Sequence, residues 1–270
     1  MSYNIGFIGC GNMGRAMMGG ILKSGLVENS NIYVADLFKP SLEKAQSEYG
    51  VNTTTDNKEV AKNADVLILS IKPNILDIVA KEIKDIIKKD CIIVSIVAGK
   101  TIEHLENAFG KEFKVIRTMP NTPALVGEGM SALCGNKNIA ESDLERVKSI
   151  FSSFGGVEVL PEYLIDAFVS VSGSSPAYVF MFIEAMADAA VCDGIPRDKA
   201  YKIAAQAVLG SAKMVLETGK HPAQLKDMVC SPAGTTIEAV EVLEEKGFRH
   251  AVMSAMKACT AKCKEMAENK

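Results

Sequence analysis

Residues 5–14 read Ile5-Gly6-Phe7-Ile8-Gly9-Cys10-Gly11-Asn12-Met13-Gly14, and this stretch decides the fold of the chain. A short apolar run, typical of a buried strand, leads into glycines spaced G-x-G-x-x-G, and residues 15–23 continue as a helix. Gly9 permits a tight turn, Gly11 lets backbone N–H groups approach a diphosphate, and Gly14 lets the helix pack closely on the strand. The pattern is a dinucleotide-binding fingerprint; its alternative is an ordinary strand-to-helix turn of an α/β domain.

Strands and helices alternate beyond this turn. We expect further strands at residues 31–35, 65–71, 91–98 and 115–118, and then at 130–134 and 157–160. The almost unbroken apolar run at 65–71 is typical of a parallel sheet that is covered on both faces, and the alternation of strands and helices indicates a doubly wound sheet. After Pro161 the strand signal disappears and helical segments account for nearly everything. We therefore expect an α/β fold with a doubly wound parallel sheet of the Rossmann type in residues 1–160, followed by an all-helical domain in residues 161–270.

Composition limits the kinds of function. The 270 residues carry 30 basic and 33 acidic side chains, without a block of like charge, so nothing suggests a nucleic-acid or membrane partner. We see no signal segment and no apolar run of the ~18–20 residues that a membrane span needs. An odd set of 7 cysteines without a C-x-x-C pair suits a reducing, cytoplasmic location. Cys259 and Cys263 lack a flanking histidine, so we expect no metal site.

Two polar residues indicate which cofactor the site could bind. Asp36 ends the second expected strand, 22 residues after Gly14, where an acid accepts a hydrogen bond from the ribose 2′-hydroxyl of NAD. Lys39 could instead neutralise a 2′-phosphate, so NADH and NADPH both stay open, and Asp36 could also be a helix-entry residue before Pro40. Cys10 would lie at a helix N-terminus, where a thiolate is stabilised, although a plain turn residue is the alternative.

The helical half contains a second informative stretch, Val229-Cys-Ser-Pro-Ala-Gly-Thr-Thr-Ile237. Its small residues leave backbone N–H groups accessible at a helix start, and Ser231, Thr235 and Thr236 add hydroxyl groups. We interpret it as a receptor for a small carboxylate, and the alternative is a helix start capped by Ser or Thr. Residues 171–178 form a similar but weaker case. The three histidines, His104, His221 and His250, lie among charged residues and are expected to be solvated.

The segment Ala177–Cys192 is apolar around most of its circumference. Such a helix is buried on all sides, and a domain of this size has little need of one. We therefore expect it to lie in a subunit interface of a homo-oligomer.

Several motifs together resemble those of the pyrroline-5-carboxylate reductases. They are GFIGCGNMG, SIKP, RTMPNTPALVGEG, SGSSPAYVFMFIEAMADAAV, AAQAVLGSAKMVLETGKHPAQLKDMVCSPAGTTIEAV and LEEKGFR, and they span residues 3–266. The resemblance implies a Rossmann domain, a helical dimerisation domain and NAD(P)H-dependent reduction of a cyclic imine to L-proline, the last step of proline biosynthesis. It also implies homodimers that can assemble into a decamer of five dimers.

The resemblance further implies site residues. On the cofactor these are Ile8, Gly9, Cys10, Gly11, Asn12 and Met13 at the diphosphate, Asn57 at the adenosine end, Ile71, Lys72, Pro73 and Ala98 along the dinucleotide, and Met119 and Asn121 beside the nicotinamide. On the substrate they are Ser231, Gly234, Thr235 and Thr236, with Glu162 nearby. Two positions depart from the family pattern. Ala233 replaces the usual glycine and would be strained at a positive φ, and Asp36 stands where NADPH-preferring members have small hydroxyl residues.

The expected chemistry needs neither a metal nor a strong nucleophile, because a protonated C=N bond accepts hydride readily. Thr236 is the candidate that hydrogen-bonds the imine nitrogen, while Ser231 and the N–H groups of residues 233–236 hold the carboxylate. One alternative is a related β-hydroxyacid dehydrogenase, but those enzymes place a lysine on the interdomain helix, and Lys199 is the first lysine after residue 161. Another is a non-catalytic dinucleotide sensor, which would have no use for the hydroxyl-rich loop.

Overall fold

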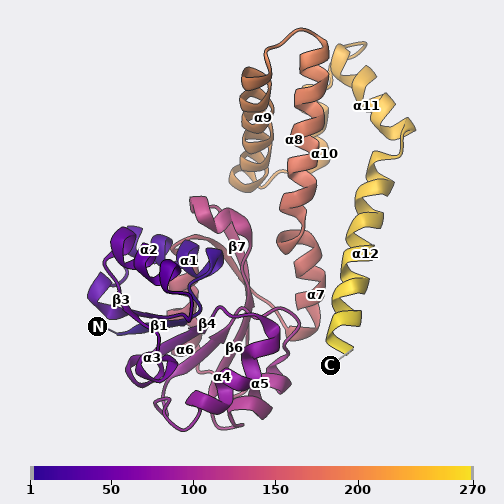
Figure 1. Cartoon of the computed structure of the whole chain (residues 1–270). Helices are drawn as coiled ribbons and strands as arrows, with labels where there is room; N and C mark the ends of the chain where they lie inside the picture. Colours follow the sequence, from indigo (N-terminus) through magenta and orange to yellow (C-terminus); the bar gives the residue numbers. More distant parts are fainter. Residues whose placement is uncertain (1–2, 269–270) are drawn as a thin grey trace. The chain divides into compact units, whose positions relative to one another are not determined.

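A computed structural model describes residues 3–268 of the chain (Figure 1). The chain forms two compact units. Unit 1 runs to Gly173 and includes the residues from Thr260 onward, and unit 2 is Ser174–Cys259. The expected Rossmann domain of residues 1–160 and the expected helical domain of residues 161–270 are defined by function as well as by packing. This division stays a prediction.

Unit 1 is built on a mostly parallel sheet of the expected class. Its strands are β1 (Ile5–Ile8), β2 (Ile32–Ala35), β3 (Asn52–Thr54), β4 (Val66–Leu69), β5 (Ile92–Ser95), β6 (Lys114–Met119), β7 (Gly129–Gly135) and β8 (Gly155–Val159). They lie in the order β3-β2-β1-β4-β5-β6-β7-β8. The strands from β3 to β6 are parallel, whereas β7 runs antiparallel to β6 and pairs in parallel with β8. The strand order therefore reverses beside β1, where open α/β sheets bind ligands.

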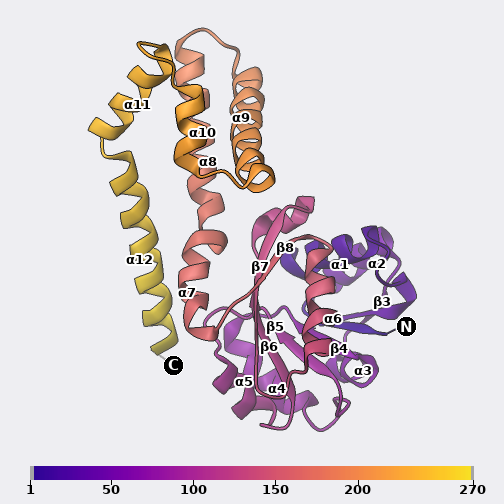
Figure 2. The same ribbon diagram turned by 180° about the vertical axis from the view of Figure 1, so that it is seen from behind.

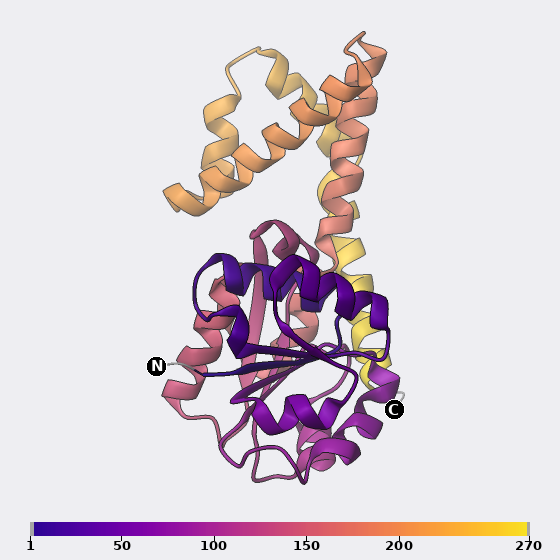
Figure 3. The same cartoon turned by 60° about the vertical axis from the view of Figure 1, so that its left-hand side comes forward.

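Helices cover both faces of this sheet (Figure 3). They are α1 (Asn12–Lys23), α2 (Lys39–Tyr49), α3 (Asn57–Asn63), α4 (Leu76–Ile83), α5 (Ile102–Phe109), α6 (Glu141–Ser152) and α7 (Ile165–Phe168). Short 3₁₀ turns are η1 (Asn29–Asn31), η2 (Pro73–Ile75), η3 (Thr122–Val126) and η4 (Glu162–Leu164), and η5 (Val169–Gly173) is a π-helical turn. Alternate strand residues serve opposite cores: Phe7 packs with α1, α2 and α6, and Ile8 packs with α3, α4 and α5.

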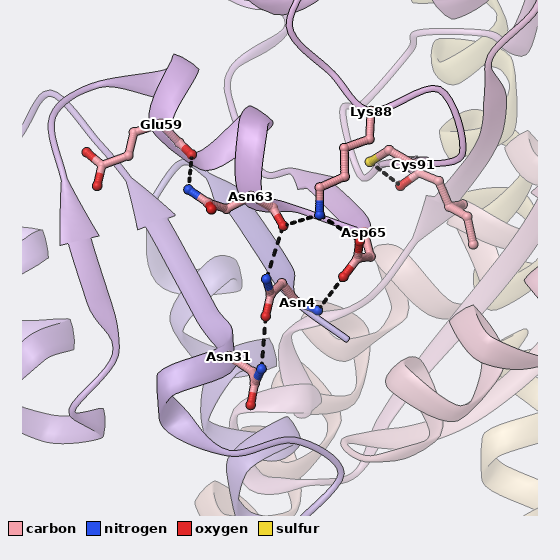
Figure 4. Close-up of polar contacts among 8 residues, drawn as sticks. Asn4, Asn31, Glu59, Asn63, Asp65, Lys88 and Cys91 are labelled. Atoms are coloured by element: carbon pink, nitrogen blue, oxygen red, sulfur yellow. Dashed lines mark hydrogen bonds and ion pairs between the residues drawn. The ribbon is translucent and has the colours of Figure 1, made fainter. Parts of the chain in front are cut away.

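A polar network fixes the amino ends of the strands (Figure 4). The N–H of Asn4 donates to Oδ2 of Asp65 at 2.8 Å, and Nζ of Lys88 contacts Oδ1 of the same carboxylate at 2.8 Å. Lys88 Nζ also donates to the carbonyl of Asn63, and Asn31 Nδ2 donates to Asn4 Oδ1 at 2.9 Å. The network joins the residues just before β1, β2 and β4, so it ties the starts of these three strands together.

Unit 2 is helical throughout its described residues (Figure 2). Its helices are α8 (Ser175–Cys192), α9 (Arg197–Thr218), α10 (Pro222–Val229), α11 (Thr235–Glu245) and α12 (Phe248–Glu268), and the last of these continues into unit 1. α8 packs along α9, and the rings of Phe182 and Phe248 lie 6.0 Å apart. The apolar surface of α8 is nevertheless open in the single chain, since Phe180 is 61% and Met181 68% exposed.

Two expectations are corrected. The segment Glu162–Cys192 is long and apolar enough to cross a membrane by length and composition alone, with a mean hydropathy of 1.3, whereas we expected no apolar run of that length. One such helix is weak evidence for a membrane protein. The residues Ser142-Asp-Leu-Glu145 have the pattern of a capping box, which predicts Ser142 as the N-cap of a helix. The N-cap is instead Ala140, α6 begins at Glu141, and Asp143 accepts from the N–H of Ala140 at 3.1 Å.

Candidate active site

The glycine turn has the geometry that its spacing predicts. Gly9 has φ +103°, and a Cβ added there would lie 2.3 Å from the carbonyl oxygen of Ser70. A Cβ on Gly14 would lie 2.8 Å from the carbonyl oxygen of Gly9, so α1 and the turn are in direct backbone contact. Gly11, the N-cap of α1, has no atom within 4 Å of an added Cβ. The first and third glycines therefore serve the turn and its packing, and the second leaves open space before the positive end of α1.

A cavity of about 380 Å³ opens at this turn. The residues predicted for the cofactor that line it are Ile8, Gly9, Gly11, Asp36, Asn57, Ile71 and Lys72. Leu37 and Phe38, exposed by 84% and 63%, form part of the same wall. The cavity lies beyond the carboxyl ends of β1, β2 and β4, and it combines an accessible helix start with apolar walls. These features fit the adenosine and diphosphate parts of a dinucleotide.

Ser70 is a residue of this site that the sequence reasoning missed. Its hydroxyl donates to the carbonyl of Gly9 at 2.7 Å and so fixes the turn from the end of β4. Its position directly after an apolar strand was the available signal, since such residues meet at the carboxyl edge of a parallel sheet.

Asp36 faces the turn. One carboxylate oxygen accepts from the N–H of Cys10 at 2.7 Å, and the other accepts from the N–H of Phe38 at 2.8 Å. The carboxylate therefore ties the end of β2 to the glycine turn and also presents negative charge to the cavity. Asp36 is also a helix-entry residue, because its carboxylate accepts from the N–H of Phe38, the N-cap of α2.

The thiol of Cys10 is buried behind the turn and is not activated. Its side chain is fully enclosed, and Sγ lies 3.4 Å from the carbonyl oxygen of Ser41. Burial raises the pKa of Cys10 to about 11, and the Asp36 carboxylate adds to this effect against the opposing charge of Arg15. Of the two interpretations of Cys10, the plain turn residue therefore stands and the stabilised thiolate does not, because desolvation outweighs the helix N-terminus.

The other predicted cofactor residues lie outside this cavity. Asn12, Met13, Gly14 and Pro73 belong to the adjoining turns of α1 and η2, while Ala98 and Met119 lie at the carboxyl ends of β5 and β6. The side chain of Asn121 is used within unit 1: Nδ2 donates to the carbonyl and hydroxyl oxygens of Ser172, both at 3.1 Å, and Oδ1 accepts from the N–H of Met130. Both ends of the side-chain amide are thus engaged within unit 1.

Glu162 is likewise engaged within unit 1. Its Oε1 accepts from the N–H of Ile102 at 2.8 Å and from Nη1 of Arg117 at 3.0 Å. The sequence offered no signal for this ion pair, whose members are 45 residues apart. A direct role of Glu162 on the substrate stays a prediction.

The predicted substrate loop lies in unit 2. Gly234 is the N-cap of α11, and Thr235 and Thr236 open the helix, which begins without a side-chain cap. A Cβ on Gly234 would lie 2.3 Å from Oγ of Ser231, so the serine hydroxyl lies directly against the helix start. The interpretation as a helix capped by Ser or Thr is wrong, and among residues 3–268 no side chain accepts from the first N–H groups of α11. Such a start suits a carboxylate.

Ala233 confirms the strain that its departure from glycine predicts. Its φ is +53°, and within residues 3–268 it is the single non-glycine residue with a positive φ. The left-handed conformation costs an alanine roughly 1–2 kcal/mol.

The histidines differ from one another. Nε2 of His104 lies 2.7 Å from Oδ1 of Asp77 and 3.1 Å from Nζ of Lys100, so this ring is part of a polar cluster and is not simply solvated, as we expected. His221 is exposed and accepts from the N–H of Ala223 at the start of α10. None of these contacts joins the cavity. Within the described residues there is also no cluster of His, Cys, Asp and Glu that could hold a metal ion.

Comparison with known proteins covers the chain from end to end. Residues 162–266 match the family model described as pyrroline-5-carboxylate reductase dimerisation, and residues 4–99 match one described as NADP oxidoreductase coenzyme F420-dependent. The pyrroline-5-carboxylate reductase of Escherichia coli is 53% identical over 272 residues, covering 100% of both chains.

Solved structures agree. A pyrroline-5-carboxylate reductase from Coxiella burnetii has a TM-score of 0.93 and 35% identity, covering 99% of each chain. The Plasmodium falciparum pyrroline carboxylate reductase with NADP bound has a TM-score of 0.87 and 34% identity, covering 98% of each chain. With full-length identity above one half to a curated relative and the same fold over both units, this chain belongs to the pyrroline-5-carboxylate reductase family.

Proposed function

We propose that the protein reduces (S)-1-pyrroline-5-carboxylate to L-proline with NADH or NADPH, as an oxidoreductase acting on a CH–NH group in the last step of proline biosynthesis. Family membership names the reaction. The observation that supports the same reaction in this chain is the open start of α1 at Gly11, beside a cavity with the size and polarity of a dinucleotide subsite.

The glycine turn would hold the cofactor. The N–H groups at the start of α1 face the diphosphate, Asp36 faces the adenosine ribose, and Asn57 stands at the adenosine end. Ala98 lies along the dinucleotide, and Met119 and the backbone of Asn121 border the nicotinamide. A reduced nicotinamide, when bound, supplies hydride to the imine carbon. The residues of unit 1 orient that group and exclude water from it.

The start of α11 would hold the substrate. The uncapped N–H groups of residues 233–236 and the hydroxyl of Ser231 bind the carboxylate. Thr236 hydrogen-bonds the ring nitrogen and holds the imine in the orientation in which it accepts hydride. As a free hydroxyl group is a poor acid, Thr236 acts through this hydrogen bond, with the proton already on the nitrogen.

NADH is the cofactor that the Asp36 geometry favours. Each carboxylate oxygen is anchored by one main-chain N–H, which leaves lone pairs to accept from a ribose 2′-hydroxyl. A 2′-phosphate would place like charge against the same carboxylate, and Lys39 would have to offset that repulsion.

The assembly would be a homodimer formed by the helical segment, in line with the dimerisation family that residues 162–266 match. The open apolar side chains of α8 support a partner surface, because monomeric proteins rarely leave such patches uncovered. We propose in addition that five dimers form a decamer, that residues 1–160 bind the cofactor and residues 161–270 serve dimerisation and substrate, and that the enzyme works in the cytoplasm.

The first experiment follows oxidation of NADH and of NADPH with pyrroline-5-carboxylate, each cofactor varied separately. We expect turnover with both, and Thr236→Ala should lower kcat/KM by roughly ten- to a hundredfold, the effect of one or two hydrogen bonds. Folded wild-type protein that binds a cofactor but turns over no substrate would contradict the proposal and favour a dinucleotide sensor.

A further inference from the structure

One carboxylate oxygen in unit 1 joins two elements that lead to residues expected along the cofactor. Oε1 of Glu162 accepts from the N–H of Ile102, the first residue of α5, at 2.8 Å and from Nη1 of Arg117, on β6, at 3.0 Å. Both donors reach the same atom, so the distance between the start of α5 and the end of β6 depends on where that atom lies.

Arg117 depends on this contact. The residue is 5% exposed and sits in the middle of the sheet, paired with Ser95 of β5 and Cys134 of β7. A buried guanidinium is tolerated only when it is paired. Its second acid, Asp166, is 3.6 Å away from Nη2, and its Nε makes no hydrogen bond within the described residues. Of the two contacts that Arg117 makes with acidic side chains, the one with Glu162 is therefore the shorter.

The start of α5 depends on the contact as well. The first N–H groups of a helix have no partner inside the helix. Thr101 accepts from the N–H of His104, and Glu162 accepts from that of Ile102. Ala98 lies only four residues before Ile102, across a turn at Gly99 with φ +71°. Movement of the helix start would move Ala98.

The same segment holds the loop after β6. Ser172, in the π-helical turn η5, accepts from the amide of Asn121, and Met119 ends β6 two residues after Arg117. π-helical turns are rare and often occur at functional sites. The loop expected beside the nicotinamide and the Ala98 turn, expected along the dinucleotide, are thus both attached to the segment 162–172.

We propose that Glu162 is a positioning residue, which fixes the spacing between the Ala98 turn and the Met119–Asn121 loop for the nicotinamide and does not contact the substrate. The inference rests on the proposed function. It explains why the Glu162 carboxylate accepts hydrogen bonds from Ile102 and Arg117.

The test compares Glu162→Ala and Glu162→Gln with Asp166→Ala as the matched control. Glutamine keeps an acceptor oxygen for both donors, and Asp166→Ala removes an acid from Arg117 without touching Ile102. The readouts are the Kd of NADPH and of NADH from nicotinamide fluorescence, the KM values of cofactor and substrate, and the Tm.

We expect Glu162→Ala to raise the cofactor Kd and KM by roughly five- to twentyfold, with the KM of pyrroline-5-carboxylate changed less than about twofold. Glu162→Gln should restore most of the affinity, and Asp166→Ala should lower Tm while leaving Kd unchanged. If Glu162→Ala does not fold, Glu162→Asp serves instead, since its shorter carboxylate keeps the charge but cannot reach both donors.

Two results would overturn the inference. A rise in the substrate KM alone would place Glu162 on the substrate, and a loss of Tm with unchanged cofactor Kd would reduce it to a purely structural residue. Because the Kd is measured without turnover, a wild-type protein that fails to reduce pyrroline-5-carboxylate would contradict the proposed function and leave this test intact.

Discussion

At residue scale, Asp36 serves both the fold and the cofactor site. Its carboxylate holds the N–H groups of Cys10 and Phe38 while it borders the cavity. A substitution that removes the charge of Asp36 should therefore change the cofactor preference. A substitution that also removes both carboxylate oxygens should in addition remove the hydrogen bonds to the turn.

We predict that the wild-type protein prefers NADH and that Asp36→Ser raises the ratio of kcat/KM for NADPH to that for NADH by roughly ten- to a hundredfold. The reason is the loss of like charge next to a 2′-phosphate. Steady-state kinetics with both cofactors measure the ratio. Asp36→Asn keeps the shape and one acceptor oxygen, so an Asn variant with an unchanged ratio would show that charge does not select the cofactor.

Ala233 is the second position where a single residue has a measurable effect. We predict that Ala233→Gly raises stability by about 0.5–1 kcal/mol, since the relief of a φ of +53° exceeds the extra entropy of the unfolded glycine chain. Denaturant unfolding at fixed protein concentration measures it. The exposed helical Ala205→Gly should destabilise by about 1 kcal/mol, and a loss of stability at both positions would argue against strain in the loop.

At the scale of elements, the strands that are buried on both faces could be predicted from their apolar runs, and the glycine spacing predicted the turn. β3 was missed because Asn52-Thr-Thr54 is a short polar edge strand without an apolar signal. The reversed direction of β7 was equally unreadable, since an apolar run does not record its orientation. The pairing of Arg117 with Glu162 and of Asp36 with Cys10 depends on tertiary contacts, so sequence spacing could not predict it.

The amino-edge network yields a pH prediction for unit 1. Burial opposes the ionisation of Asp65, but the N–H of Asn4 and the ammonium of Lys88 outweigh it and lower the pKa of Asp65 below its ordinary value. The stability from this depressed pKa is present above the unfolded-state pKa of about 3.9 and is lost as the pH falls through the folded value.

We therefore predict that Asp65→Asn lowers the free energy of unfolding by about 1 kcal/mol at neutral pH, a modest value because the side chain is 35% exposed and partly screened by solvent. The difference from wild type should shrink toward pH 3. Asp85→Asn, at an exposed position, should show neither effect. A deficit that stays constant down to pH 3 would mean that the carboxylate charge does not act through this network.

At the scale of the whole molecule, the open face of α8 requires a partner. We predict that the wild-type protein is at least a dimer at micromolar concentration and that Phe180→Glu converts it to a less stable monomer, because a charge would be buried in the interface. Light scattering measures the mass. Ile78→Glu, on an exposed apolar residue of α4 in unit 1, is the control and should leave the mass unchanged. A monomeric wild type would contradict the interface that the apolar circumference of α8 predicts.

Unit 1 is made of two stretches of the chain, with unit 2 inserted between Gly173 and Thr260. The two ends of the insert are close, since Sγ of Cys259 lies 3.2 Å from Oγ of Ser174. During synthesis on the ribosome, the nucleotide-binding half is therefore missing its last segment until all of unit 2 has emerged, although domains generally fold in order of emergence. A nascent chain stalled before residue 260 would carry the whole sheet of unit 1 without the segment that follows unit 2.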